Sequence, residues 1–307
     1  MAAMKRLSLV VLVGLIVAGP ARTLAENAAG GRVIRTIAVG VRPESVTRGF
    51  GGHHYVTVMG EPGPGDGVVK VIRGDRVEVF AEGMDEPKGI AFLGDRLVTA
   101  DLKRVWQIDA QGRKSLLADE SAFPKPVSYL NDVAAAPDGQ SVYVTDMGAR
   151  DKMMDPAGRL WPLGSAEARS LPVLGRVYQI TRDGKVRLVV QGTRAMACPN
   201  GVAAPAKGEL LIAEFFYGNL LRWQGPQLRI LSSGFRGADG IEQGRDGRIY
   251  VSSWTQGKLW RLAPDGSSPE VLIEGLRSAA DFCLDEEAGE LWLPDMKAGQ
   301  VLVLRLP

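Results

Sequence analysis

The 307 residues of this chain are 45% hydrophobic, which is enough apolar material to bury a large core within one domain. Lysine and arginine together number 37, aspartate and glutamate number 35, and the basic residues form no stripe along the chain. This balance argues against nucleic acid as a partner, because nucleic-acid binding requires clustered positive charge.

Residues 1–25 have the pattern of a cleaved secretory leader. Lys5 and Arg6 precede an apolar stretch over residues 7–19, and residues 23–25 offer a cleavage site of small residues. The apolar stretch is short for a membrane span. We therefore expect a periplasmic or secreted protein without membrane attachment after cleavage, with an uncleaved anchor as the alternative. Cleavage would leave 34 basic and 35 acidic side chains.

The rest of the chain reads as short strands joined by turns. Residues 32–39 alternate well enough between apolar and polar side chains to form one strand. Asp-Gly pairs at residues 138–139, 183–184, 246–247 and 265–266 lie between apolar runs, where glycine accepts the positive φ of a hairpin turn. No segment beyond the leader has a helical period, so the sequence predicts an all-β fold.

Six segments of the chain begin alike, with a polar or small residue, then a hydrophobic strand and a turn containing glycine. Their starting positions are Glu44, Lys88, Asn131, Asn200, Asp239 and Ala280, at spacings of 44, 43, 69, 39 and 41 residues. A propeller blade of four antiparallel strands occupies roughly 40–45 residues. The sixth segment supplies only three strands, so the strand at 32–39 would complete it and close the ring. The sequence predicts a single six-bladed β-propeller over residues 32–307, with four-stranded antiparallel blades.

The spacing of 69 residues marks an insertion at residues 147–174 in the third blade. In a propeller, this loop lies on the face where the innermost strands begin. Long loops in compact domains often cover a site. A loop that merely packs over the propeller is the alternative, and the sequence leaves both open.

Propeller geometry gathers the first residues of the innermost strands around the central axis. This ring would contain two carboxylates and two amides, from Glu44, Asp239, Asn131 and Asn200, with Asp132 and Asp281 one step further in. Such hard oxygen ligands suit Ca²⁺, Mg²⁺ or Mn²⁺ better than a soft metal. Lys88 occupies the same ring, where its ammonium would repel a cation, or would pair with Glu44 or Asp239 and replace it.

The motifs at these positions resemble the gluconolactonase family, which includes senescence-marker lactonases, luciferin-regenerating enzymes and diisopropyl fluorophosphatase. The matching motifs are Glu44 in Pro-Glu, Asn131 in Leu-Asn-Asp, Asn200 in Pro-Asn-Gly and Asp239 in Asp-Gly, in the family's order. The resemblance covers about residues 32–307. It implies a six-bladed propeller with a divalent cation at the centre of one face, usually calcium, with Mg²⁺, Mn²⁺ or Zn²⁺ as alternatives.

This resemblance also implies roles for the ring residues. Glu44, Asn200 and Asp239 would bind the cation, and Asn131 would bind it or orient the substrate. Asp239 would be the general base toward water, or a nucleophile. The implied reaction is hydrolysis of a lactone or related ester of a small-molecule substrate. Candidates for the pocket wall are Lys88, Phe215, Phe216, Tyr217, Trp254 and Trp161, although the aromatic residues could equally pack between blades.

Two other functions remain open. A non-catalytic propeller would bind a ligand or a protein partner, with Lys88 replacing the metal charge and residues 147–174 supplying the contact surface. A propeller similar to strictosidine synthase would use a central carboxylate without a metal. A serine-hydrolase triad has no support, because the chain lacks a Gly-x-Ser-x-Gly motif.

The remaining candidate side chains are expected to be structural. His53 and His54 precede a strand predicted at residues 55–59 and would be turn or surface residues. Cys198 and Cys283 fall two blades apart, so we expect two free and mostly buried thiols.

Overall fold

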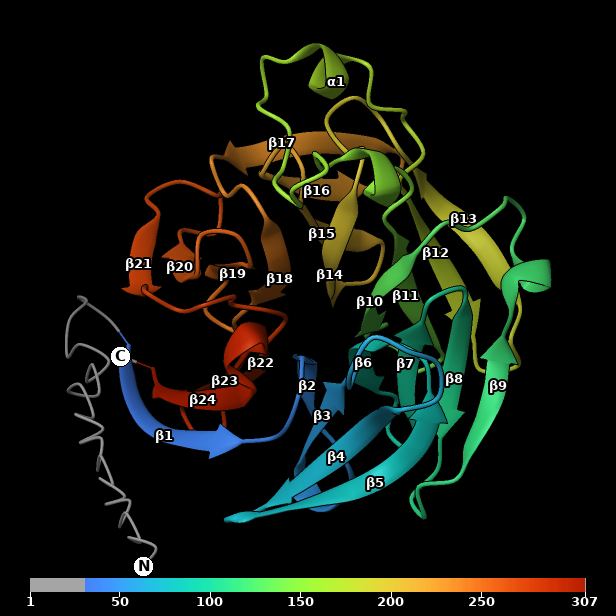
Figure 1. The fold of residues 1–307 in the computed structure, drawn as a ribbon, viewed down its shortest axis with the longest axis vertical. Coiled ribbons are helices and arrows are strands. Elements are labelled where there is room, and N and C mark those ends of the chain that lie inside the picture. Colours follow the sequence, from blue (N-terminus) through green and yellow to red (C-terminus); the bar gives the residue numbers. More distant parts are fainter. Residues whose placement is uncertain (1–30, 307) are drawn as a thin grey trace, which may run out of the picture.

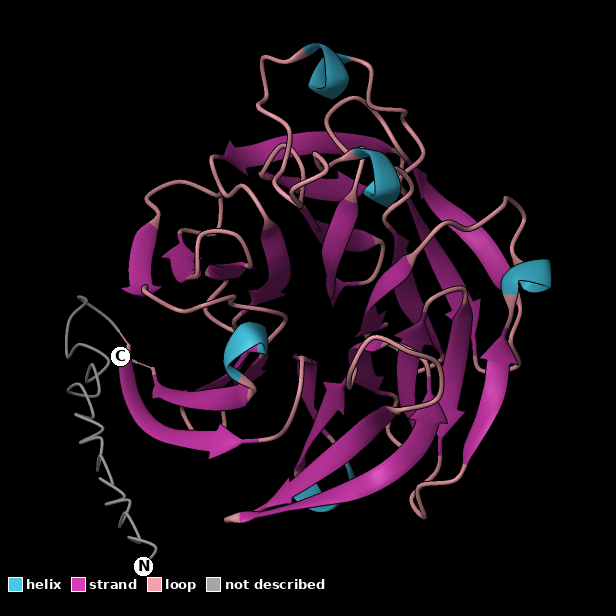
Figure 2. Cartoon of the chain, viewed as in Figure 1, coloured by secondary structure: helices cyan, strands magenta, loops and turns pink. Residues whose placement is uncertain are grey.

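The computed structural model describes residues 31–306. Six four-stranded antiparallel sheets surround a central axis, each with one edge strand at the axis and the other at the rim (Figure 1). Strands and turns make up nearly all of this part of the chain (Figure 2). The predicted six-bladed β-propeller is therefore confirmed. The predicted leader at residues 1–25 lies outside the described residues. Within residues 31–306 there is no helix of the length and apolarity that crossing a membrane requires.

Five blades run from the innermost to the outermost strand in chain order. The first blade contains β2 (Pro43–Arg48), β3 (His54–Val58), β4 (Gly67–Arg73) and β5 (Arg76–Met84), and the second contains β6 (Pro87–Phe92), β7 (Leu97–Asp101), β8 (Arg104–Ile108) and β9 (Lys114–Ala118). The third contains β10 (Leu130–Ala135), β11 (Ser141–Asp146), β12 (Arg176–Thr181) and β13 (Val186–Gln191), and the fourth contains β14 (Pro199–Ala206), β15 (Glu209–Glu214), β16 (Asn219–Gln224) and β17 (Gln227–Ser233). The fifth contains β18 (Ala238–Gln243), β19 (Ile249–Ser253), β20 (Lys258–Leu262) and β21 (Glu270–Ile273).

The sixth blade joins the two ends of the described chain. From the axis outward it contains β22 (Cys283–Asp285), β23 (Glu290–Asp295), β24 (Gln300–Arg305) and β1 (Arg32–Ala38). β1 pairs antiparallel with β24, so the N-terminal strand closes the last blade as predicted. Apolar side chains then hold the closure, since Val56 of the first blade and Trp292 and Val303 of the sixth belong to one buried cluster. Burying each such side chain stabilises the fold by roughly 1.5–3 kcal/mol.

Helical structure is limited to short turns. They are η1 (Phe50–Gly52), η2 (Glu120–Ala122), η3 (Arg150–Lys152), α1 (Ala166–Arg169) and η4 (Met296–Ala298). Both η3 and α1 belong to the insertion between β11 and β12. In α1 the hydroxyl of Ser165 accepts a hydrogen bond from the backbone N–H of Ala168 and so caps the turn.

The innermost strands are irregular at one place, and this irregularity forms the ring. In β2, the pairing with β3 shifts between Pro43 and Val46, and β6, β10, β14 and β18 shift at the equivalent place. A bulge leaves residues without partners and redirects their side chains. Each of these blades therefore delivers one side chain to the axis at the same height, namely Glu44, Lys88, Asn131, Asn200 and Asp239.

Hydroxyl groups tie neighbouring blades together beside the bulges. Thr145 Oγ1 accepts a hydrogen bond from Asp132 N at 2.9 Å and donates one to the carbonyl of Asn200 in the next blade at 2.6 Å. Ser252 Oγ links Gly240 N and the carbonyl of Ala280 in the same way. These bonds satisfy backbone groups that the bulges leave unpaired and fix the distance between consecutive ring positions.

Glycine follows the ring residue in three blades because the next blade lies too close for a Cβ. A Cβ at Gly89 would collide with the Cα atom of Asp132, and one at Gly201 would collide with the carbonyl oxygen of Asp239. At Gly240 it would lie 2.5 Å from Asp281 Oδ1. None of the three has a positive φ. They serve close packing of backbone around the axis and not a turn conformation.

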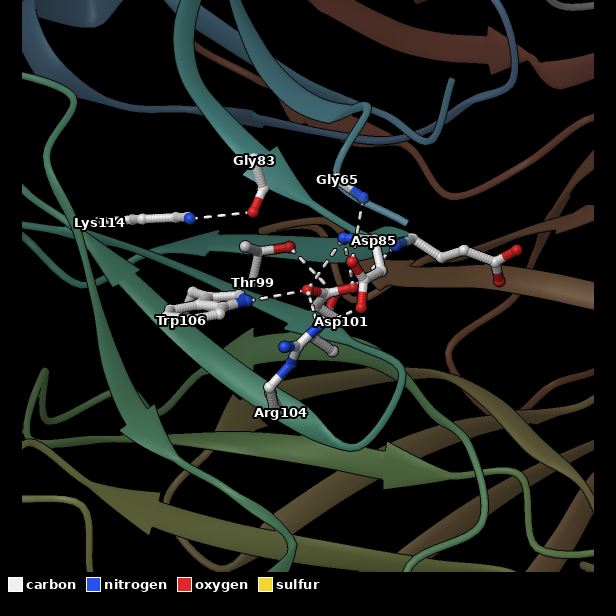
Figure 3. Close-up of polar contacts among 10 residues, drawn as sticks. Gly65, Gly83, Asp85, Thr99, Asp101, Arg104, Trp106 and Lys114 are labelled. Atoms are coloured by element: carbon white, nitrogen blue, oxygen red, sulfur yellow. Dashed lines mark hydrogen bonds and ion pairs between the residues drawn. The ribbon is translucent and has the colours of Figure 1, made fainter. Parts of the chain in front are cut away.

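A buried acidic residue ends the second strand of four blades and holds the segment that leads to the axis. Figure 3 shows the example of Asp101, whose carboxylate accepts hydrogen bonds from Glu86 N at 2.7 Å and Asp85 N at 3.1 Å, and from the side chains of Arg104 and Trp106. Asp146, Glu214 and Asp295 do the same for Ser128 N, Cys198 N and Ser278 N, respectively. Sequence reasoning overlooked this repeat, although an acid at the end of the second strand was its visible signal.

His54 does not lie on the surface, contrary to the prediction. It opens β3 and is only 7% exposed, because the first and sixth blades pack together at this point. Its ring stacks on Trp292 at 3.7 Å between centroids, and Nε2 lies 3.3 Å from a carboxylate oxygen of Asp285. Burial is the main cause that lowers the pKa of His54 to about 4, with Arg48 adding to it and Asp285 opposing it. His53 is partly exposed.

Because His54 is buried in its neutral form, we expect the free energy of unfolding to fall in mild acid. The folded pKa lies below the unfolded value of about 6.5, so the contribution of neutral His54 is present above pH 6.5 and is lost as the pH falls toward 4. His54→Phe keeps the stacking on Trp292 and should remove up to about 3 kcal/mol of that loss. The measurement is the free energy of unfolding in urea at pH 7 and pH 4.5, with His53→Phe as the control. Equal acid sensitivity in both variants would show that His54 does not carry the effect.

Candidate active site

A cavity of about 340 Å³ opens on the face where the innermost strands begin. Five ring residues line it together, and each is at most 5% exposed: Glu44, Lys88, Asn131, Asn200 and Asp239. The structure therefore brings into one cavity every residue that the sequence assigned to the cation or to catalysis. Ala280, the ring position of the sixth blade, is fully buried and does not line the cavity.

Three oxygen atoms of this ring are buried without a hydrogen-bond partner among residues 31–306. They are Glu44 Oε2, Asn131 Oδ1 and Asp239 Oδ1, from three different blades. The amide nitrogen of Asn131 donates to Met147 Sδ at 3.1 Å, which leaves its oxygen facing the cavity. Leaving a buried polar atom unpaired costs roughly 1–3 kcal/mol. These atoms are the hard donors that a divalent cation of the calcium or magnesium type takes as ligands.

Burial makes the ionised forms of the two ring carboxylates, Glu44 and Asp239, unfavourable. Burial raises the pKa of Glu44 to about 8, with Lys88 opposing the change and Asp281 adding to it. Burial, then Glu44 and Asp281, raises the pKa of Asp239 well above its usual value. Both groups are therefore driven toward the protonated form, and a cation between them would reverse this. In the described part of the chain no three His, Cys, Asp or Glu side chains form a metal-binding group, so the donor set depends on the amides of Asn131 and Asn200.

Lys88 lies on the cavity wall and does not form an ion pair with the carboxylates of the ring. Its ammonium donates to Met59 Sδ at 3.0 Å and lies 4.9 Å from the centroid of the Tyr129 ring. Among residues 31–306 no carboxylate oxygen lies within 4 Å of it, so the direct ion pair with Glu44 or Asp239 is not formed. Burial works against the charged form, but Tyr129, Glu44 and Glu86 outweigh it and raise the pKa of Lys88.

A second set of polar residues lies two positions before the ring residues, and sequence reasoning missed it. Arg42, Glu86 and Tyr129 come from the first three blades and line the cavity together. Tyr129 Oη donates to Glu86 Oε2 at 2.7 Å, and Arg42 lies 3.6 Å from Glu86 Oε1. The signal was available, because each of the three stands at the same offset from its ring residue.

The insertion at residues 147–174 supplies one wall of the cavity and also packs over the propeller. Met147, Arg150, Met153 and Met154 line the cavity. The same segment buries apolar side chains against Phe215 and Phe216 of the fourth blade. With Met59 and Met296, five methionines face the cavity, and such flexible apolar side chains adapt to ligands of different shape.

Of the aromatic residues predicted for the pocket wall, Phe215 and Trp254 line the cavity. The insertion covers Phe216 and Tyr217, and Trp161 belongs to the insertion itself, so none of the three lines the cavity. Phe216 is fully buried, and Tyr217 Oη donates to the carbonyl of Ala168 in α1 at 3.3 Å. The carbonyl of Trp161 accepts a hydrogen bond from Arg236. These three residues anchor the insertion.

Asp132 and Asp281 belong to the interior beneath the ring. They line a second cavity of about 360 Å³, whose other walls are residues farther along the inner strands, so it lies toward the opposite end of the axis. Asp281 accepts a hydrogen bond from Ser45 Oγ, and Asp132 accepts one from Val202 N at 2.6 Å. Both bonds join adjacent blades, which is a structural role.

Cys198 and Cys283 are both free, as predicted. Cys198 is buried, whereas Cys283 is partly exposed and lines the second cavity. Burial is the main cause that raises the pKa of both thiols, so they stay protonated at neutral pH. Neither thiol is activated as a nucleophile.

Comparisons with known proteins agree with this geometry. The sequence model described as "SMP-30/Gluconolactonase/LRE-like region" matches residues 68–214. No curated protein matches the sequence significantly. Among solved structures, a gluconolactonase from Xanthomonas campestris superposes with a TM-score of 0.59 at 19% identity, over 90% of this chain and 99% of its own. An X-ray structure of another protein assigned as a gluconolactonase superposes with a TM-score of 0.62 at 15% identity, over 91% and 93%.

At such identities the structural likeness concerns the fold, and the family assignment depends on the sequence model. The match over residues 68–214 agrees with the resemblance inferred from the ring motifs, and the chain forms the six-bladed β-propeller of the gluconolactonase structures.

Proposed function

We propose that this protein is a metal-dependent hydrolase that opens a lactone or a related ester of a small molecule. The observation that carries the proposal is the set of three buried, unpartnered oxygens of Glu44, Asn131 and Asp239, which come from three blades and meet in one cavity. The family whose sequence model matches residues 68–214 supports the same reaction class. The pattern of residues 1–25 adds the proposal that the enzyme works in the periplasm or outside the cell.

Glu44, Asn200 and Asp239 would hold the cation, with Asn131 as a further ligand or as the group that orients the substrate. Calcium is the first candidate, since the donors are carboxylate and amide oxygens. When bound, such a cation polarises a carbonyl oxygen and stabilises the negative charge that develops on it during hydrolysis.

The side chains around the ring would complete the reaction. Asp239 is the candidate general base, because a carboxylate beside the cation can accept a proton from a water molecule in the cavity. Lys88, held over Tyr129, would attract the carboxylate that forms when the ring opens. Phe215, Trp254 and the methionines would surround the apolar part of the substrate and limit its contact with water.

Metal analysis of the purified protein tests the proposal first. We expect about one equivalent of divalent cation, a lower melting temperature after chelation, and recovery on addition of Ca²⁺. A ligand that binds only the folded state stabilises it by about 2.7 kcal/mol at a hundredfold excess over Kd. Initial rates on a panel of lactones, followed by acid release, would then rise and fall with the bound cation.

Absence of metal, of a Ca²⁺-dependent shift and of lactone turnover would overturn the proposal. That result would favour the non-catalytic propeller, in which the positive charge of Lys88 replaces the cation and residues 147–174 contact a partner.

A further inference from the structure

We propose that a basic cleft beside the central cavity binds an anionic group of the substrate, a carboxylate or a phosphate. The substrate would then be a negatively charged lactone or ester and not a neutral one. The identity of the reacting bond rests on the proposed function, whereas the anion site itself does not.

The cleft has a volume of about 340 Å³ and lies between the insertion and loops of the fifth and sixth blades. Four of its lining residues are cationic, namely Arg159, Arg236, Arg277 and Lys297, and no acidic residue is among the lining residues. It shares Met154, Trp254 and Lys297 with the central cavity, so the two spaces adjoin. A ligand at the ring can therefore extend into the cleft.

Three of the four cations lack a counter-ion in the described part of the chain. No carboxylate of residues 31–306 lies within 4 Å of Arg236, Arg277 or Lys297, whereas Arg159 pairs with Asp155 at 2.9 Å. The Nε atom of Arg236 is buried and has no hydrogen-bond partner among the same residues, although its guanidinium also donates to the carbonyl of Trp161. Like charges gathered without a counter-ion repel one another. A bound anion would relieve this repulsion and accept the unused N–H of Arg236.

Trp254 and Lys297 stand where the cleft meets the cavity. Lys297 Nζ lies 3.9 Å from the centroid of the Trp254 ring, and Trp254 Nε1 donates to Met296 Sδ at 3.1 Å, which fixes the indole. A substrate would place its carbonyl at the ring of oxygens, its body along Trp254 and its anionic group against Arg236, Arg277 and Lys297. Guanidinium groups suit this role because their paired N–H groups match carboxylate and phosphate oxygens.

The test compares a neutral lactone with an anionic analogue. Glucono-1,5-lactone and its 6-phosphate differ by one phosphate group, and we expect the phosphorylated lactone to have a KM at least tenfold lower with a similar kcat. Both side chains replaced in the double variant Arg277→Gln/Lys297→Gln are exposed. The variant should raise the KM of the phosphorylated lactone about tenfold and that of the neutral lactone by a clearly smaller factor, since Lys297 also lines the central cavity. Lys207→Gln/Arg229→Gln, at two exposed positions outside the cleft and the central cavity, is the control with the same loss of two charges.

Binding of inorganic phosphate by calorimetry separates the cleft from the reaction. Phosphate binding by the wild type but not by the double variant would support the anion site. If no lactone is hydrolysed in the same experiments, the anion site is retained and the proposed function is overturned. If neutral and phosphorylated lactones are hydrolysed with equal KM and the double variant binds phosphate like the wild type, the anion site is overturned. Acetate in place of phosphate shows whether a carboxylate suffices. Melting temperatures of the variants would confirm that each is folded.

Discussion

Asp239→Asn should lower kcat/KM for a lactone substrate at least about a hundredfold and should weaken Ca²⁺ binding strongly. The change keeps the size of the side chain but removes the charge and one of the two carboxylate oxygens at the axis. Loss of a single group that stabilises a developing charge typically costs a factor of about 10²–10³ in rate. Here the same residue would both hold the cation and accept the proton. The measurements are steady-state rates and a calcium titration of the chelated protein.

The same variant should be more stable than the wild type once the cation is removed. Burial raises the folded pKa of Asp239 above its unfolded value, so ionisation of this group favours the unfolded state and lowers stability at pH values above the unfolded pKa. Asparagine has no such cost. In saturating Ca²⁺ the order should reverse, because only the wild type gains binding energy. Urea unfolding with chelator and with Ca²⁺ measures both effects.

The matched control is Asp75→Asn, on the exposed hairpin between β4 and β5. It should change neither rate nor calcium affinity. Should Asp239→Asn bind Ca²⁺ as tightly as the wild type, Asp239 would not be a ligand, and the ring would need another explanation.

The fold and the ring were accessible from the sequence for one physical reason. A propeller repeats one structural unit around an axis, so equivalent positions of the repeat meet in space even when they are far apart in the chain. Glu44 and Asp239 could therefore be placed in one site without any contact information. The closure of the ring could also be predicted, because the sixth repeat has only three strands and one extra strand precedes the first repeat.

Contacts that break the symmetry of the repeat could not be predicted from the sequence pattern. The insertion belongs to one blade only, and its path decides that Phe215 faces the cavity while Phe216 and Tyr217 lie beneath the loop. The direction of Lys88, toward Met59 and Tyr129, depends on side-chain packing within the cavity. The basic cleft joins the insertion to loops of two later blades, which no periodic pattern connects.

His54 shows a related limit. Its neighbours in the chain are glycines and a second histidine, which indicate a turn, but its environment is set by Trp292 at the far end of the sequence. Closure of the ring makes this contact, and closure is a property of the whole fold.

Gly201→Ala should destabilise the protein by about 2–3 kcal/mol and weaken the calcium site as well. The added methyl would collide with the carbonyl oxygen of Asp239 in the next blade, and backbone at the axis cannot move away freely. Overpacking of a well-packed interior typically costs about 1–3 kcal/mol. Relief of the collision would push the fifth blade outward and carry the carboxylate of Asp239 away from Glu44. Urea unfolding and a calcium titration measure the two effects.

Two further variants separate the effects of the collision at Gly201 from the effects of any added methyl group or any loss of stability. Gly63→Ala makes the same change where a Cβ would meet no atom within 4 Å, and it should alter neither stability nor affinity. Val303→Ala removes buried methyl groups in the sixth blade and should lower stability without moving the ring. If Val303→Ala weakened calcium binding as much as Gly201→Ala at equal loss of stability, the calcium effect would be a general consequence of a loosened fold. A larger effect from Gly201→Ala would mean that the absence of one Cβ sets the spacing between two blades, and with it the geometry of the site.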